Sequence, residues 1–489
     1  MLIFGDSVKT LLRPLILACS SLARSFLACS FLAVSLSACS TSQQDDDINA
    51  KQVTWHQDIA PLVMEKCGSC HTAGGIAPFS IQSYEETKQW APDMSKAIRN
   101  GTMPPWGAEE TDECTPPGSF KDDIRLTDKE KELFEAWIKG GRLEGDPDEA
   151  AQLPTPAPLE LDEPDRQLTI PSSATVEGTK DDFVCFTLDP EVTERVWLTG
   201  TQVTPGNEAI VHHALVFLDR EGQGADLADE NGQYKCFGSA LLDKNVLLGA
   251  WAPGATPAML PDNMGSPLEP GDKLVVQVHY HPTGSGAEVD DSTRIDLKWT
   301  NVEPDYVGGI YLIGNFETEN LKFAGGDGFG LVTGPDFLIP AGATNHVETN
   351  RFFIDDKGDF LARLVPIHVW MVGSHMHYVG TDLKITSEDV HGDEQCLLQT
   401  PHWDFNWQRG YFFDGPVGEL PVIHPGDSLT MRCTYNNSLD NPFVRDALAD
   451  EGLSEPKDVA LGNETLDEMC LGVFGFAVEK KYAEDFGLY

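Results

Sequence analysis

The spacing of apolar and polar positions changes near residue 166 of the chain. Before it, Val53–Lys66 and Thr127–Lys139 carry apolar residues at helical intervals. The second segment opens with a capping box of Thr127 and Glu130 and stops at two glycines, Gly140 and Gly141. The pattern therefore predicts a small all-α domain over residues 53–145.

After residue 166, short apolar runs are separated by turns rich in Gly, Pro, Asn and Asp, and long helical periodicity is scarce. The clearest runs are Val211–Leu218, Lys273–Val278, Tyr306–Leu312 and Leu364–Val372. This punctuation is typical of antiparallel sheets folded as sandwiches or jelly rolls.

Residues 146–165 join the two regions and are rich in proline and acidic residues. The prolines that stiffen this stretch are Pro154, Pro156, Pro158 and Pro164. We expect an extended spacer between modules.

The first residues have the pattern of a secretory signal, because basic residues precede the apolar run Phe26–Ala38. The run ends Leu36-Ser37-Ala38-Cys39, which resembles the bacterial lipobox and implies that Cys39 is lipidated. The alternative is an ordinary signal with an incidental cysteine. We predict a signal over 1–38, a tether over 39–52, and a lipid-anchored, extracytoplasmic protein in which disulfides persist.

Charge and length exclude other classes of protein. The 489 residues carry 34 basic and 78 acidic side chains, a net charge of −44, which repels nucleic-acid phosphates. After the N-terminal segment no apolar run approaches the roughly 20 residues of a membrane span, so the lipid is the only expected membrane contact. Eleven cysteines are too few for a disulfide-dense miniprotein.

The sequence Cys67-Gly68-Ser69-Cys70-His71 is the C-x-x-C-H haem attachment pattern. Two thiols one helical turn apart can bond the porphyrin, and the adjacent histidine then meets the iron. Residues 53–145 resemble class I cytochromes c, which implies one covalent haem c and Met103 as second axial ligand. Met64 and Met94 compete for that role, although each also suits core packing.

Six of the thirteen histidines lie in three groups, each adjoining a predicted strand. The groups are His212-His213, His279-Tyr280-His281 and His375-Met376-His377. Alternate strand residues share a face, so His375 and His377 can hold one metal. Adjacent His212 and His213 can share a metal only where the strand is distorted or their side chains curl back. Imidazole suits copper, zinc, iron or nickel. Met469 joining two histidines would favour copper, because a thioether stabilises Cu(I).

Four segments resemble the type II copper, ascorbate-dependent monooxygenases, the family of the peptidylglycine α-hydroxylating and dopamine β-monooxygenases. They are Val211–Phe217 with its His-His pair, Leu274–Tyr280, Gly373–His377 and Asp467-Glu468-Met469-Cys470, in the family's order. The resemblance implies that His212, His213 and His279 bind an electron-donating copper. It implies that His375, His377 and Met469 bind the copper where oxygen reacts, and that Cys433 and Cys470 form a disulfide.

The resemblance also implies two jelly rolls, at 166–303 and 304–489. The predicted fold is therefore a small all-α cytochrome c domain followed by two all-β antiparallel jelly-roll sandwich domains. The prediction assigns no disulfide partners to the remaining cysteines, Cys114, Cys185, Cys236 and Cys396. His281 has no counterpart among the family ligands, so it lies beside the site or is exposed, and His368 is expected to be structural.

Gly373 stands where the peptide-amidating enzymes have an arginine that binds the substrate carboxylate. A peptide with a C-terminal glycine is therefore disfavoured, and a small organic substrate is expected.

The predicted reaction is copper-dependent hydroxylation of a C–H bond with O₂. Its electrons come from ascorbate, from another reductant such as a periplasmic donor, or through the fused haem. The haem is a candidate because covalent linkage keeps it at a high effective concentration near the copper sites. One alternative is a copper-binding electron-transfer lipoprotein without hydroxylase activity. Another is an oxidase that reacts at the haem.

Overall fold

The computed structural model describes residues 52–486 except 74–76, 155–159, 179, 237–238, 244–245, 254, 316–336, 355–364 and 463–465. The predicted signal, the lipidation at Cys39 and nearly all of the tether lie outside the described residues. Among the helices that the structure describes, none is long and apolar enough to cross a membrane.

The predicted helices are present in the N-terminal region. A π-helical turn, Trp55–Ile59, leads into α1 (Ala60–Lys66), and α2 (Tyr84–Asn100) and α3 (Asp128–Lys139) follow. The Thr127 and Glu130 capping box is formed, and α3 ends before Gly140 as predicted. The three helices gather around one apolar core, which includes Trp55, Ile59, Val63, Phe134 and Trp137. Short helical segments elsewhere are Pro147–Glu149, α4 (Gln223–Leu227), Val417–Glu419, α5 (Pro442–Asp450) and Lys480–Phe486.

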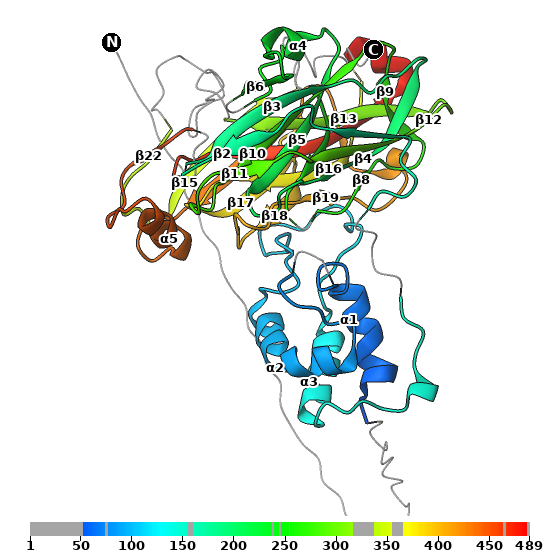
Figure 1. Ribbon diagram of the computed structural model, residues 1–489, viewed down its shortest axis with the longest axis vertical. Coiled ribbons are helices and arrows are strands. Elements are labelled where there is room, and N and C mark those ends of the chain that lie inside the picture. Colours follow the sequence, from blue (N-terminus) through cyan, green and yellow to red (C-terminus); the bar gives the residue numbers. More distant parts are fainter. Residues whose placement is uncertain are drawn as a thin grey trace, which may run out of the picture. The chain divides into compact units, whose positions relative to one another are not determined.

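The rest of the chain is mostly β-strand, as the pattern after residue 166 predicted (Figure 1). The first half contains β1 (Arg166–Thr169), β2 (Ala174–Val176), β3 (Asp182–Leu188), β4 (Val196–Thr204), β5 (Val211–Asp219), β6 (Gln233–Lys235), β7 (Val246–Trp251), β8 (Ala258–Met259), β9 (Met264–Leu268), β10 (Lys273–Tyr280), β11 (Glu288–Asp290) and β12 (Arg294–Thr300). The second half contains β13 (Tyr306–Gly314), β14 (Leu338–Ile339), β15 (His346–Phe353), β16 (Ile367–His375), β17 (Gly380–Glu388), β18 (Glu394–Thr400), β19 (Gly410–Phe412), β20 (Val422–Ile423), β21 (Ser428–Tyr435), β22 (Val459–Ala460) and β23 (Leu471–Glu479).

One sheet runs through both halves. In the first half β7, β5, β10 and β3 pair in that order, all antiparallel, and Figure 1 shows β3, β10 and β5 side by side. In the second half β16 pairs with β23. Strand β13 pairs with β23 over its whole length and also with β7 and β9. The sheet therefore continues across the expected domain boundary at 303/304, where the chain passes from β12 to β13.

Two segments that were predicted to belong to the helical domain and the spacer instead pack on the β-strands. Cys114 forms a disulfide with Cys396 of β18, and the Lys121 N–H donates to the Phe412 carbonyl at 2.7 Å. In the predicted spacer, Leu161 is buried and the Trp299 N–H donates to the Asp165 carboxylate at 2.7 Å. Residues 160–165 are thus no free spacer, because backbone and apolar contacts hold them on β4 and β12.

Candidate functional site

The first candidate site is built by neighbouring strands β5 and β10. His279 of β10 pairs with His213, whereas Tyr280 pairs with Val211, so the register skips one residue of β5 at His212. Of the two possibilities that the sequence left open, the structure shows the distorted strand, because this bulge lets two adjacent histidines turn toward His279. The structure therefore brings together the three histidines of the predicted electron-donating site.

The three imidazoles converge through their Nδ1 atoms. His213 Nδ1 lies 3.4 Å from His212 Nδ1 and 3.2 Å from His279 Nδ1. An ion about 2.0 Å from each nitrogen would separate its ligand nitrogens by about 3.3–3.5 Å in a tetrahedral or trigonal arrangement. The spacing thus fits a metal ion held by three histidines.

A carboxylate lies behind the third of these histidines. Asp181 Oδ1 lies 3.4 Å from His279 Nε2 and 2.6 Å from His281 Nδ1. A carboxylate on the outer nitrogen of a histidine fixes its ring orientation and raises its basicity as a metal ligand. His281, whose role the sequence left open, therefore lies beside the site and binds the carboxylate that faces His279.

The second candidate site lies at the end of β16. His375 Nδ1 donates to Gln408 Oε1 at 2.7 Å, and His377 Nδ1 donates to the Asp467 carbonyl at 3.1 Å. Because both Nδ1 atoms are engaged, the Nε2 lone pairs are free to bind a metal. The two rings lie 5.3 Å apart and, with Met469, line the same cavity.

Backbone contacts fix Met469 beside these histidines. The buried Glu468 carboxylate accepts hydrogen bonds from the backbone N–H groups of His377 and Met469, which joins the two ligand-bearing segments. The Tyr435 hydroxyl donates to the Met469 carbonyl at 2.8 Å. The predicted disulfide between Cys433 and Cys470 is present, so β21 holds the residue next to Met469.

Burial favours the neutral form of four of the site histidines. It lowers the pKa of both His212 and His377 to about 3, with repulsion from neighbouring histidines acting in the same direction. The pKa values of His213 and His375 are lowered for the same first reason. Neutral imidazole is the form that binds metals, so these residues are ready to coordinate at neutral pH. Burial conversely raises the pKa of Glu468 to about 8.

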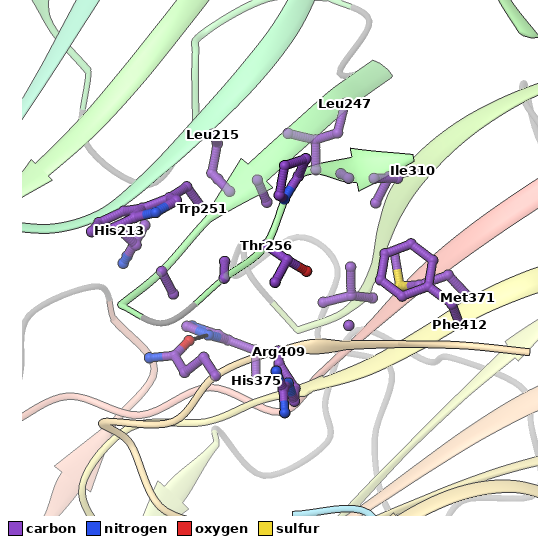
Figure 2. A pocket seen from close by; sticks show the side chains of 18 of the residues that line it. His213, Leu215, Leu247, Trp251, Thr256, Ile310, Met371, His375, Arg409 and Phe412 are labelled. Atoms are coloured by element: carbon purple, nitrogen blue, oxygen red, sulfur yellow. Dashed lines mark hydrogen bonds between the residues drawn. The ribbon is translucent and has the colours of Figure 1, made fainter. Parts of the chain in front are cut away.

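Both histidine groups face one cavity of about 760 Å³. Figure 2 shows His213 on the strands of the first half and His375 and Arg409 on segments of the second half. The walls between them are mostly apolar, with Leu215, Leu247, Trp251, Ile310, Met371 and Phe412 among the lining residues.

Arg409 supplies a cation to the cavity where the sequence suggested none. A side chain at Gly373 would begin 3.2 Å from the Arg409 carbonyl and 3.3 Å from Val473, which leaves little room there. Arg409 lies beside the Gly410 that pairs with Gly373, and Lys121 and Lys298 also line the cavity.

The C-x-x-C-H residues fit haem attachment. Among the described cysteines, Cys67 and Cys70 are free, whereas the other six form three disulfides. His71 Nδ1 lies 3.1 Å from the Phe79 carbonyl, so its Nε2 is available to an iron. Gly68 is required between the cysteines, since a Cβ there would lie 2.7 Å from the Met64 carbonyl.

The three methionines that could be the second axial ligand differ in burial. Met64 is buried in the helical core and Met94 packs against it, in agreement with the packing role expected for both. Met103 is half-buried in the turn after α2, and its ligation of iron remains a prediction.

The sequence comparisons point to oxygen-inserting enzymes. The chain is 24% identical over 338 residues to the peptidylglycine alpha-amidating monooxygenase of Rattus norvegicus, which covers 67% of this chain and 28% of the relative. It is 29% identical over 245 residues to the dopamine beta-hydroxylase of Homo sapiens, covering 48% and 35%. The similarity supports the monooxygenase family that the motifs resemble. The chain spans about a third of the length of these curated relatives.

Two further comparisons add nothing to this. No family model matches the chain. A solved structure of an infectious bursal disease virus strain matches 68% of this chain and 77% of its own, with a TM-score of 0.17 and 8% identity. The major capsid protein of bacteriophage PM2 matches 64% of this chain and 97% of its own, with a TM-score of 0.18 and 9% identity. Scores this low carry no argument about fold.

Sequence reasoning missed several residues that complete the site. Phe405, Gln408 and Arg409 lie in the loop 401–409, and Trp106 and Asp181 come from distant parts of the chain. The sequence gives no periodic signal for them, because tertiary contacts alone bring them to the cavity.

Proposed function

We propose that this chain is a copper-dependent monooxygenase that hydroxylates a C–H bond of a small organic substrate with O₂. The observation that carries the proposal is that members of two possible donor sets line one cavity. His213 and His279, which converge with His212, line it, and so do His375, His377 and Met469. The similarity to monooxygenases supports the same proposal of a monooxygenase.

The donor chemistry favours copper at both sites. Three neutral imidazoles suit Cu(I) and Cu(II), and a thioether beside two imidazoles favours Cu(I) over zinc. Copper bound there would supply O₂ activation at the methionine site and a second electron from the three-histidine site. Gln408 would hold the ring orientation of His375 during turnover, because it accepts a hydrogen bond from the outer nitrogen of this histidine, and the Asp181 carboxylate would lie near the outer nitrogen of His279.

The cavity walls would select and position the substrate. Leu215, Ile310 and Phe412 offer apolar contacts that exclude water around a hydrocarbon group. The crowding at Gly373 keeps the family's arginine out of its usual position. A C-terminal glycine peptide is therefore disfavoured, and we propose a largely apolar small molecule.

Cys67, Cys70, His71 and Met103 would hold a haem c that accepts electrons from a periplasmic donor. Ascorbate or another reductant is the alternative source. The three disulfides suit an oxidising, extracytoplasmic compartment, and lipidation at Cys39 would anchor the protein to the membrane.

Labelled oxygen tests the proposal. Purified protein loaded with copper is supplied with a reductant, ¹⁸O₂ and a panel of apolar small molecules, and the products are examined by mass spectrometry. We expect one ¹⁸O atom per hydroxylated product, and none from the Met469→Ala or His375→Ala variant. Tight copper binding with no ¹⁸O incorporation across the panel would favour an electron-transfer lipoprotein instead.

A further inference from the structure

The loop 401–409, between β18 and β19, contacts both histidine sets. The Phe405 ring stacks on His212 at 4.8 Å and meets the edge of His377 at 5.9 Å. Gln408 accepts the hydrogen bond from His375 Nδ1 at 2.7 Å. One loop thus touches a ligand of the three-histidine site and both histidines of the methionine site.

The same loop contacts the segment that follows the C-x-x-C-H helices. The Arg409 guanidinium lies over the Trp106 ring, 5.0 Å from its centre, and Nη1 donates to the Pro105 carbonyl at 3.1 Å. Trp106 also meets Tyr411 edge-on at 5.1 Å and lines the cavity. Such a cation–π contact keeps the two side chains packed together.

Several bonds fix this segment on the β-strands. The Gly107 N–H donates to the Tyr411 hydroxyl at 3.0 Å, and the disulfide between Cys114 and Cys396 ties the segment to β18. Glu113 pairs with Arg432 of β21 at 2.5 Å. The Trp106–Arg409 contact therefore joins two firmly attached parts.

We propose that Trp106 and Arg409 couple the haem electronically to the His375 side of the cavity, an inference that rests on the proposed function. Trp106 lies three residues after Met103, the predicted axial ligand. From its ring the contacts lead to Arg409, along the backbone to Gln408, and by a hydrogen bond to His375. Electrons tunnel faster through bonded and packed atoms than across solvent, so this continuous path is the favoured one.

The step would be a one-electron transfer from the haem that Cys67, Cys70 and His71 would hold to the copper that His375, His377 and Met469 would hold. The iron would lose one electron, the copper would gain it, and no proton or group would move. The haem would thus deliver electrons directly to the methionine site, whereas the family resemblance alone assigns electron supply to the three-histidine site.

Flash photoreduction measures this transfer without substrate turnover. A flavin photoreductant injects one electron into the haem of anaerobic, oxidised, copper-loaded protein, and haem absorbance then follows its reoxidation. We expect the Trp106→Leu variant to reoxidise about tenfold more slowly, as does Arg409→Met, which removes the contact from the other side. The matched control is Phe120→Leu, because Phe120 belongs to the same segment but packs on Tyr411 and Phe413. We expect this variant to keep the wild-type rate.

The identity of the acceptor gives a second readout. Reoxidation should persist in a His212→Ala, His213→Ala double variant and disappear in a His375→Ala, His377→Ala double variant. Wild-type rates in both Trp106→Leu and Arg409→Met, equal slowing in Phe120→Leu, or loss of reoxidation in the His212, His213 variant alone would overturn the proposal. Failure of the hydroxylase function would appear separately, as absent ¹⁸O incorporation with electron transfer intact.

Discussion

The disulfide between Cys433 and Cys470 should position Met469 as well as stabilise the fold. Cys470 follows Met469 directly and immediately precedes β23, and Cys433 lies in β21. Replacing both cysteines by serine would leave Met469 held by its backbone contacts to Glu468 and Tyr435. The variant therefore separates the disulfide's two roles.

The loss of stability can be worked from the loop that each disulfide closes. The Cys433–Cys470 bond spans 37 residues, which gives about 3.8 kcal/mol of chain-entropy stabilisation. The Cys185–Cys236 bond spans 51 residues and gives about 4.1 kcal/mol, so its removal is a matched control for stability. We expect similar destabilisation of the two double serine variants in denaturant unfolding.

The affinity of the methionine site for copper should distinguish the two double serine variants. We expect Cu(I) affinity at the His375, His377 and Met469 site, measured by competition with a chelator, to fall by about tenfold in the Cys433→Ser, Cys470→Ser variant only. If both variants lose the same stability and both keep the wild-type Cu(I) affinity, the disulfide does not position Met469.

Three other predictions concern packing and protonation. Phe405→Ala should cost about 3 kcal/mol in denaturant unfolding of the metal-free protein, because its buried ring fills the space between His212 and His377; a cost below about 1 kcal/mol would contradict this packing. Gly68→Ala should lower the thermal stability by about 1–3 kcal/mol, since the new Cβ meets the Met64 carbonyl at 2.7 Å, and an unchanged melting curve would refute the close approach. The metal-free protein should be fully stabilised by its neutral histidines above pH 6.5 and lose that stability as the pH falls toward about 3, the lowered pKa of His212 and His377. His377→Gln should make this acid dependence shallower, and an identical slope would count against its burial as a neutral imidazole.

The sequence allowed the prediction of ligands that lie in regular strands or next to motif residues. The alternation of strand side chains predicted that His375 and His377 face the same side, and the structure puts both on the cavity. Strand β16 nevertheless ends at His375, and His377 lies in the segment after it, where its Nδ1 bonds the Asp467 carbonyl. The convergence of His212 with His213 depends on a bulge whose position the pattern did not define. The sequence showed that a regular strand could not bring the two histidines together, whereas the bulge that does so depends on pairing with His279.

Contacts between distant segments could not be predicted from the sequence. The pairing of Cys114 with Cys396 joins residues 282 positions apart, and four cysteines allow several pairings. Residues near Trp106 seemed to belong to the helical domain. The Gly107 N–H, however, donates to the Tyr411 hydroxyl of β19 and the Glu109 N–H to the Gln399 carbonyl of β18, and these bonds hold the segment on the β-strands. The sequence did not predict Arg409 as a cavity residue, because it lies in a loop outside any motif.

Metal binding tests the central claim most directly. Anaerobic Cu(I) loading followed by X-ray absorption should show two copper ions per chain, each with nitrogen neighbours, and one sulfur neighbour for every two coppers. Met469→Ile should abolish the sulfur signal and keep the nitrogen signals. A single copper per chain, preferential binding of zinc, or a sulfur signal unchanged in Met469→Ile would contradict the proposed pair of sites.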